Sequence, residues 1–376
     1  MNIAGLIFSS GHSENIPELT RARTVGSIPF LCRYRLIDFT LSNMVNAGIT
    51  NIGIITDYNY RSLFDHIGNG KDWDLSRRSG GIKFIPPNVT SFDRIKPFSA
   101  YENKLYALLN AKSFINRCGC DYIVLTDASS VMTLDIQKLA CDHINSSAFM
   151  TLVTTRIKNG EIELDSSVNV VTSGENNQVR DISFYKEKKG DTEIFTGTLI
   201  ISRRELESFI ELAISRSYSD FKSDFIDRSV KRRLVRAYSY EGYYAYFSSL
   251  ASYFSQSLKV LDPKVQQNLF SDSHRIFTKL RNSPPVKYLD GAKVKNSLIA
   301  DGCIIEGEVE NSLLFRGVEI QKGAKVKNSI LLQDSFVGEN SHINFVITDK
   351  NVIIKPSRTL SGNESLPFFI SKGGIV

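Results

Sequence analysis

The sequence predicts an α/β domain followed by a parallel β-helix. Three observations support this. Strand-like and helix-like segments alternate up to about residue 255, Ser283-Pro284-Pro285 is a strong stop signal, and the chain beyond Asp290 is strand-like, rich in glycine and repetitive. We therefore expect domains at residues 1–255 and 290–376 with a linker over 256–289. A chain of 376 residues is long enough for two cores.

The first domain is expected to contain a mostly parallel sheet with right-handed crossovers, because apolar strand-like runs alternate with segments of helical periodicity. Predicted strands lie at residues 2–8, 50–56, 121–127 and 146–157 and in the first half of 193–214. Predicted helices lie at 32–48, with Gly48 as the C-cap, at 103–115 and in the second half of 193–214. Residues 69–88 and 171–181 are predicted to be loops or excursions from the sheet.

The second domain repeats itself. The heptapeptide Gly-Ala-Lys-Val-Lys-Asn-Ser occurs at Gly291–Ser297 and again at Gly323–Ser329. Branched aliphatic residues also recur at six-residue steps, as Ile299 and Ile305, as Ile320, Val326 and Leu332, and as Val337 and Ile343. This period is typical of a β-helix with one short strand on each side of a coil. A β-sandwich with coincidental spacing is the weaker alternative.

Composition excludes several classes of protein. The net charge of +6 comes from scattered basic residues without interleaved aromatics, which argues against nucleic-acid binding. No apolar run approaches the ~20 residues that span a bilayer, and the N-terminus does not have the pattern of a signal peptide, so we expect a cytoplasmic protein without membrane contact. The five cysteines lack zinc-ligand spacing, which predicts free thiols and no metal.

Two stretches carry a family resemblance. The segment RYRLIDFTLSN at Arg33–Asn43, followed by Asn46–Ile49, resembles the sugar-nucleotide pyrophosphorylases and, more narrowly, glucose-1-phosphate adenylyltransferase. The C-terminal repeats are similar to that family's β-helix. The resemblance implies a Rossmann-like nucleotidyltransferase domain and a left-handed β-helix. It also implies tetramers that use Mg²⁺ to join ATP and glucose 1-phosphate into ADP-glucose and pyrophosphate.

The first loop departs from the family's phosphate-binding motifs. Aligned without gaps, the catalytic Arg of the family falls on Asn15 and the Lys on Val25. Glu14 adds a carboxylate to this loop, and a carboxylate ~4 Å from a phosphate costs roughly 4 kcal/mol at an effective dielectric near 20. Loss of the arginine, a cation that stabilises the transition state, costs about 3 kcal/mol. The resemblance thus leaves only the remnant of a phosphate loop, formed by Ser10, Gly11, His12, Ser13, Glu14 and Arg23.

The far side of the expected site is also incomplete. Asp127 matches one metal-binding aspartate of the family, but Tyr246 stands where the second is expected. Glu187 and Lys188 are a remnant of the sugar-side motif, and Arg33 and Arg35 lie where the resemblance places an effector region. We therefore expect no complete catalytic set, no metal and no cofactor in this chain.

Three functions are compatible with this pattern. The favoured one is a catalytically impaired, regulatory subunit of the GlgD type for glycogen biosynthesis. It would form a heterotetramer with a catalytic adenylyltransferase subunit that carries the Mg²⁺, or a homo-oligomer when alone. The second is an active adenylyltransferase whose rearranged site uses His12 and Arg21 as replacement cations. The third is a free-standing protein that senses a sugar phosphate or nucleotide.

Overall fold

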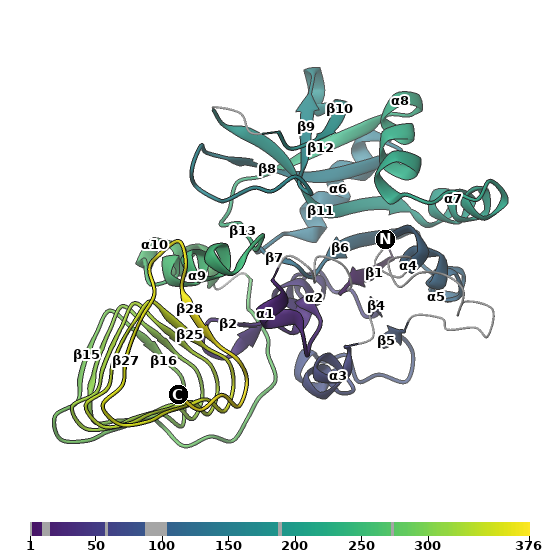
Figure 1. Ribbon diagram of the computed structural model, residues 1–376. Coiled ribbons are helices and arrows are strands. Elements are labelled where there is room, and N and C mark those ends of the chain that lie inside the picture. Colours follow the sequence, from purple (N-terminus) through teal and green to yellow (C-terminus); the bar gives the residue numbers. More distant parts are fainter. Residues whose placement is uncertain (1, 10–15, 57–58, 87–103, 187–189, 272–273) are drawn as a thin grey trace.

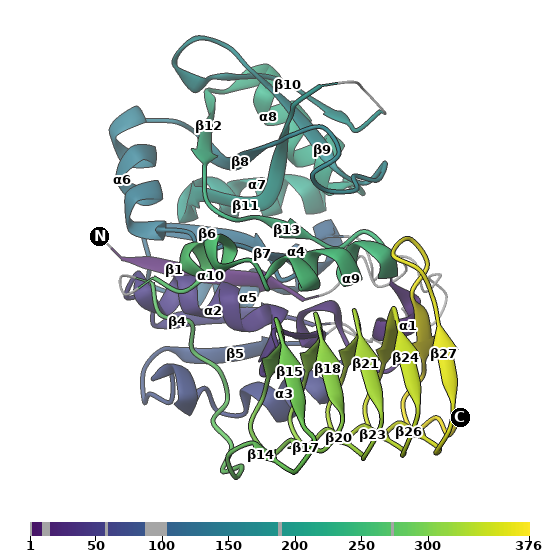
Figure 2. The same cartoon turned by 90° about the vertical axis from the view of Figure 1, so that its left-hand side faces the viewer.

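The computed structural model describes residues 2–9, 16–56, 59–86, 104–186, 190–271 and 274–376. It shows an α/β domain beside a prism of stacked coils (Figures 1 and 2). Within the described ranges, no helix combines the length and the apolar character needed to cross a bilayer. The left-handed β-helix and the mixed α/β domain confirm the predicted fold class.

A nine-stranded sheet forms the centre of the α/β domain, in the order β10-β9-β11-β6-β1-β4-β5, with β8 pairing β11 and β12. Every residue of β1 is buried and the strand pairs in parallel with β4 and β6, as expected for a strand covered by helices on both faces. The strands are β1 (Ile3–Phe8), β4 (Asn51–Ile55), β5 (Gly81–Ile85), β6 (Tyr122–Asp127), β8 (Met150–Ile157), β9 (Asn169–Ser173), β10 (Val179–Phe184), β11 (Thr192–Ser202) and β12 (Val235–Tyr240).

Helices cover both faces of this sheet. They are α2 (Leu36–Asn46), α3 (Arg61–Ile67), α4 (Lys104–Asn110), α5 (Lys112–Arg117), α6 (Ile136–Ser146), α7 (Arg203–Ser215), a π-helix (Phe221–Asp227) and α8 (Arg228–Arg232). One apolar core contains Leu108, Ile115 and Phe225, and the other contains Leu41 and Leu139. The helices α4, α5 and the π-helix thus lie on the face opposite to α2 and α6.

The ends of α2 follow from its sequence. At the N-terminus, Asp38 accepts a hydrogen bond of 3.0 Å from the backbone N–H of Arg35, which is one half of a capping box. At the C-terminus, Gly48 takes a φ of 75° immediately after the last turn, a conformation that favours glycine. The C-cap is Ala47, so the predicted glycine lies one residue beyond the cap, and the helix begins four residues later than position 32.

Two predictions about the first domain are wrong. The segments expected to be loops or excursions include β5, the end of β9 and the start of β10. These strands are half-exposed and lack the continuous apolar runs by which the other strands were recognised. The sheet is mixed rather than mostly parallel: β11 is antiparallel to β6, β8 and β9. The chain enters β11 from the antiparallel hairpin β9–β10 rather than from a crossover helix, so β11 runs against its neighbours.

Three parallel five-stranded sheets form the β-helix (Figure 2). The two copies of the heptapeptide provide β15 and β21 of one sheet, and Ile305, Ile320 and Val337 stack in the core of another. The sheets are β14 (Lys287–Tyr288), β17 (Ile304–Ile305), β20 (Glu319–Ile320), β23 (Phe336–Val337) and β26 (Ile353–Ile354); β15 (Lys293–Lys295), β18 (Glu308–Glu310), β21 (Lys325–Lys327), β24 (His342–Asn344) and β27 (Thr359–Ser361); β16 (Leu298–Ile299), β19 (Leu313–Leu314), β22 (Ile330–Leu331), β25 (Val346–Thr348) and β28 (Phe368–Ile370).

The sheet that begins with β16 packs against the α/β domain. Its Leu313, Ile330 and Ile347 share an apolar core with Phe30 and Tyr253. The α/β side contributes α1 (Pro17–Thr20), the hairpin β2 (Pro29–Phe30) and β3 (Tyr34–Arg35), the pair β7 (Ser130–Val131) and β13 (Ala245–Tyr246), and the helices α9 (Leu250–Lys259) and α10 (Pro263–Leu269). The expected boundary at residue 255 falls inside α9, and α10 lies within the expected linker.

Candidate functional site

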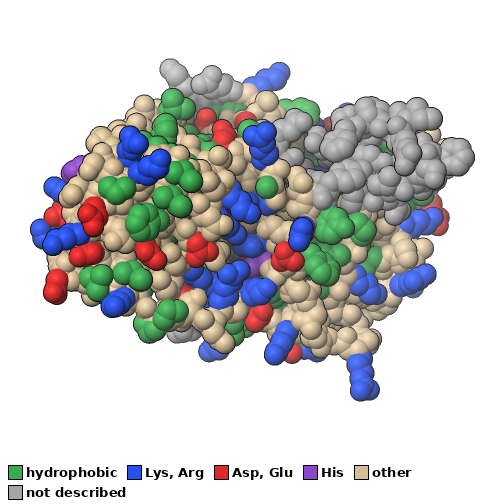
Figure 3. Space-filling model, turned by 60° about the horizontal axis from the view of Figure 1, so that its bottom comes forward, with side chains coloured by type: hydrophobic (Ala, Val, Ile, Leu, Met, Phe, Trp, Pro, Cys, Tyr) green, Lys and Arg blue, Asp and Glu red, His purple; other side chains and the backbone are tan. Residues whose placement is uncertain are grey.

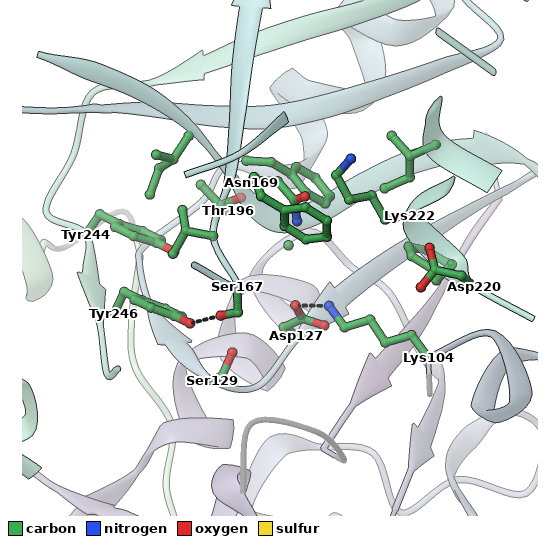
Figure 4. Close-up of a pocket in the computed structure, with 17 residues that line it drawn as sticks. Lys104, Asp127, Ser129, Ser167, Asn169, Thr196, Asp220, Lys222, Tyr244 and Tyr246 are labelled. Atoms are coloured by element: carbon green, nitrogen blue, oxygen red, sulfur yellow. Dashed lines mark hydrogen bonds and ion pairs between the residues drawn. The ribbon is translucent and has the colours of Figure 1, made fainter. Parts of the chain in front are cut away.

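A cavity of about 290 Å³ opens where β6 ends, beside β11, the β9–β10 hairpin and the π-helix (Figure 4). The carboxyl ends of strands are the usual place for ligands in open α/β sheets. The cavity is lined by Lys104, Asp127, Ser129, Ser167, Val168, Asn169, Phe184, Ile194, Phe195, Thr196, Gly197, Asp220, Phe221, Lys222, Ile226, Tyr244 and Tyr246. Hydroxyls, two lysines, two aspartates and aromatic rings together suit a small polar molecule.

Asp127 lies at the end of β6 and points into this cavity. Its Oδ2 forms an ion pair with the ammonium of Lys104, which begins α4 (Figure 4). Its Oδ1 is buried and has no hydrogen-bond partner. Gly197 makes room for the carboxylate, because a Cβ on this residue of β11 would overlap Asp127. The carboxylate is thus held from one side and unsatisfied on the other.

Tyr246 fills the position where the family resemblance places a second aspartate. It lies on β13, opposite Ser130 of β7, and its side chain is only 6% exposed. The phenol is hydrogen-bonded to the hydroxyl of Ser167 at 3.0 Å, and burial raises its pKa far above the ordinary value. A neutral phenol, rather than a carboxylate, therefore faces Asp127 across this part of the cavity.

Polar groups on the opposite wall are partly engaged. Lys222 donates to Asp227 at 3.0 Å and lies 4.6 Å from the ring centre of Phe184. Asp220 accepts a hydrogen bond of 2.6 Å from the backbone N–H of Ser223 and so caps the π-helix. The buried Oδ1 of Asn169 has no partner and remains available to a ligand hydroxyl.

These donors do not fit a magnesium site. Mg²⁺ requires oxygen ligands in octahedral geometry and usually one or two carboxylates. Among the residues that the structure describes, no three His, Cys, Asp or Glu side chains come together as a metal-binding group. The carboxylate of Asp127 is already paired with an ammonium group, and Tyr246 supplies no charge.

The first loop is only partly within the described residues. Ser10, Gly11, His12, Ser13, Glu14 and Asn15 lie outside them, as do Glu187 and Lys188. Val25, which aligns with the family's lysine, is 6% exposed and packs in the apolar core shared with the β-helix. An ammonium group at this position would have to leave that core or be buried in it.

Arg23 does not line the cavity. Its guanidinium is buried and donates to both carboxylate oxygens of Asp349 in the β-helix, at 2.7 and 2.6 Å. The structure thus gives this residue of the expected phosphate loop a different role: it joins the two domains. The other nitrogen of its guanidinium, Nη1, is buried without a partner.

Arg33 and Arg35 lie on the rim of a second hollow, between the β2–β3 hairpin and the β-helix. Basic side chains gather around this hollow on the face shown in Figure 3. Arg281, Arg316 and Lys350 come from the other side, so that five cations line it together with His66. This hollow had been only partly anticipated, because Arg281 and Lys350 were not singled out from the sequence.

The hollow contains too few anions for its cations. Arg316 is paired with Asp301 at 3.3 Å, and its Nη2 is buried without a partner. Asp38 and Asp65 are the carboxylates that act on Arg35, and Asp38 is also bound at 2.6 Å to His66. Burial, together with Arg35, Arg23 and Arg281, lowers the pKa of Lys350 to about 7. A multivalent anion would relieve this repulsion.

Comparison with known proteins divides the chain in the same way as the structure. Residues 4–235 match the nucleotidyl transferase family, and residues 284–376 match the GlmU-like C-terminal hexapeptide family. The chain is 31% identical over 98% of its length to the glycogen biosynthesis protein GlgD of Bacillus subtilis, of which it covers 95%. It is 32% identical over 87% of its length to a glucose-1-phosphate adenylyltransferase of Thermosipho africanus, of which it covers 78%. The corresponding enzyme of Bacillus thuringiensis is 27% identical over 93% of this chain, which covers 92% of that enzyme. The chain therefore belongs to the nucleotidyl transferase family and, within it, to the group formed by glucose-1-phosphate adenylyltransferases and GlgD.

Proposed function

We propose that this chain is a regulatory, catalytically impaired subunit of a glucose-1-phosphate adenylyltransferase in glycogen biosynthesis. The observation that carries the proposal is Tyr246. Transfer of an adenylyl group concentrates negative charge on phosphates, and cations must stabilise that charge. A buried neutral phenol at this position offers no carboxylate to hold a metal cation, and the carboxylate of Asp127 is already paired with an ammonium group.

The first loop supports the same conclusion. Asn15 stands where the family has its catalytic arginine, and Val25 stands where it has a lysine. Val25 packs in an apolar core, and Arg23 is committed to Asp349. The cations expected around the nucleotide phosphates are thus absent or directed elsewhere among the residues that can be placed.

The basic hollow supports a regulatory role. It lies between the two domains and collects cations from both, so an anion bound there would interact with both at once. A ligand that prefers one arrangement of two domains shifts the population toward that arrangement. We propose that an anionic effector binds at Arg33, Arg35 and Lys350 and that a catalytic partner subunit senses it through this chain.

The decisive experiment compares two preparations. The chain purified alone should form ADP-glucose from ATP, glucose 1-phosphate and Mg²⁺ at a rate several orders of magnitude below that of a catalytic family member. Co-expressed with the catalytic paralogue of the same genome, it should co-purify with that subunit at a fixed stoichiometry and change its turnover. Turnover by the isolated chain at the rate of a normal family member would refute the proposal.

A second candidate, a protein that binds a sugar phosphate without a partner, is favoured by the intact cavity beside Asp127. The same preparations distinguish it from the first candidate. Such a protein would bind glucose 1-phosphate in calorimetry but would neither co-purify with the paralogue nor alter its rate.

A further inference from the structure

The ion pair between Lys104 and Asp127 has a role beyond filling space. Asp127 is 8% exposed, and its partner is the first residue of α4, 23 positions earlier in the chain. Lys104 is 24% exposed as a side chain and also lies 5.9 Å from the ring centre of Phe8. Figure 4 shows the lysine reaching across the floor of the cavity to the carboxylate. Its ammonium group therefore lines the cavity beside Asp127.

The local charge is balanced in the same way as at a two-carboxylate metal site. A divalent cation held by two carboxylates gives a net charge of zero. Here the neutral Tyr246 stands in place of one carboxylate, and the ammonium group of Lys104 balances Asp127. Asp165 lies behind Tyr246, whose phenol donates to it at 3.4 Å, so the buried carboxylate that faces the cavity from β6 is Asp127, and it has its own counterion.

A divalent cation could not simply be added to this arrangement. It would have to displace Lys104 from Asp127 and then remain close to its ammonium group, and two like charges at such a distance repel strongly. The other acidic residue on the cavity wall, Asp220, is engaged at the start of the π-helix.

We propose that Lys104 takes the place of the divalent cation, so that the cavity binds the phosphate group of a sugar phosphate without any metal. An ammonium group has three N–H donors, of which Asp127 uses one. The remaining donors can bind phosphate oxygens, while Asn169 and the hydroxyl groups of Ser129 and Ser167 face the sugar. This inference rests on the proposed function only for the identity of the ligand, a phosphorylated hexose.

Two measurements on the full-length chain test the metal and the ligand separately. The first is a titration with Mn²⁺ alone, followed by electron paramagnetic resonance. We expect the signal of free Mn²⁺ to remain unattenuated at equimolar protein. Stoichiometric Mn²⁺ binding that disappears in Asp127→Asn would overturn the proposal whether or not any sugar binds.

The second measurement is calorimetry with glucose 1-phosphate, in Mg²⁺ and in EDTA. The dissociation constants should agree within about twofold, and Lys104→Met should weaken binding about tenfold or more in both buffers. Lys138→Met is the matched control, because Lys138 forms an exposed pair with Asp135 at 3.5 Å on α6. Binding that requires Mg²⁺, or that is unchanged in Lys104→Met, refutes the role of Lys104.

A variant that retains the ammonium group covers the case in which Lys104→Met does not fold. Asp127→Asn removes the anion that competes with phosphate for Lys104, so affinity for glucose 1-phosphate should be unchanged or tighter. A metal-dependent site would instead lose affinity when its carboxylate is removed, and such a loss would contradict the proposal. If the wild-type chain binds no glucose 1-phosphate in either buffer, the sugar-phosphate ligand is wrong, and the Mn²⁺ titration alone decides the assignment of Lys104.

Discussion

The ion pair between Arg23 and Asp349 should contribute strongly to the attachment of the two domains. Both side chains are 6% exposed, the two carboxylate oxygens accept from one guanidinium nitrogen, and the Nη1 of Arg23 has no partner. In Asp349→Asn the arginine keeps its charge in a buried site and loses its counterion. Removing one partner of a buried pair costs about 3–5 kcal/mol, and the lower value applies here because the amide oxygen still accepts a hydrogen bond.

This cost translates into a measurable change of melting temperature. With ~2.1 cal/mol/K of unfolding entropy per residue, the 376 residues give about 0.8 kcal/mol/K, so a loss of about 3 kcal/mol lowers the Tm by about 4 °C. The double variant Arg23→Met with Asp349→Leu removes both charges and should melt within about 1 °C of the wild type. Differential scanning calorimetry in a buffer without phosphate measures all three proteins.

The control is Asp74→Asn, which breaks the exposed pair between Asp74 and Arg77 and should leave the Tm unchanged. Two results would refute the reasoning. One is an Asp349→Asn variant that melts within 1 °C of the wild type. The other is a double variant that is destabilised as much as the single one, because the loss would then come from packing rather than from an uncompensated charge.

Four further predictions concern the basic hollow, the cavity and the dependence of stability on pH. Because the pKa of Lys350 is lowered to about 7 in the folded chain, its protonated form is lost as pH rises through 7. The affinity for pyrophosphate, measured by calorimetry, should therefore fall from pH 6 to pH 8.5. Lys350→Arg keeps its charge and should make the affinity less dependent on pH. The same shift means that the unfolded chain binds more protons than the folded chain between pH 7 and 10, so the contribution of Lys350 to the free energy of unfolding should rise with pH over this window. If the free energy of unfolding of Lys350→Met rises with pH as steeply as that of the wild type, the prediction is wrong. Gly197 has a φ of 83°, and the methyl group of Gly197→Ala would press against Asp127, so this variant should lower both the Tm and the affinity for glucose 1-phosphate. The control is Gly160→Ala, because Gly160 also has a positive φ but open space around it. This control should affect only stability. Burial lowers the pKa of His143 to about 4, so the contribution of its neutral form to stability should be lost as pH falls from about 6.5 to 4. Over this range the Tm of His143→Gln should fall less steeply with decreasing pH than the Tm of the wild type. Identical slopes would rule this out.

The fold was largely predictable because its strongest signals are local. A buried strand such as β1 is a continuous apolar run, and the β-helix repeats its inward-facing residues at a fixed step. The hairpin β9–β10 lacks such a run, and the direction of β11 depends on how the chain returns to the sheet, which no local pattern encodes.

The candidate site was less predictable, because its pairs join distant parts of the chain. Asp127 and Tyr246 were found by alignment to motifs, but the partner of Asp127 was not. Lys104 lies in the helix predicted at 103–115 but was not singled out, although a cation in that segment was a usable signal. Arg23 matched a conserved motif letter, yet its contact with Asp349 spans 326 positions and follows from how the domains pack.

Besides the apolar contacts along the sheet that begins with β16, polar contacts join the β-helix to the α/β domain at two separate coils. At one, the Cys32 thiol donates to the carbonyl of Leu298 on β16 at 3.4 Å; at the other, three coils further on, Arg23 holds Asp349 just after β25. A stack that touches only its nearest neighbours can normally gain or lose a coil freely. Here the number of coils between β16 and β25 is fixed by the distance between Cys32 and Arg23 in the α/β domain, because each of them contacts a particular coil. Insertion of one whole coil should therefore be tolerated after β28 and should break one of these contacts when placed between β19 and β22, a difference that melting curves of the two insertions would reveal. The domain interface thus restricts the number of coils between these two contacts, and it limits where coils can be inserted into this chain during evolution.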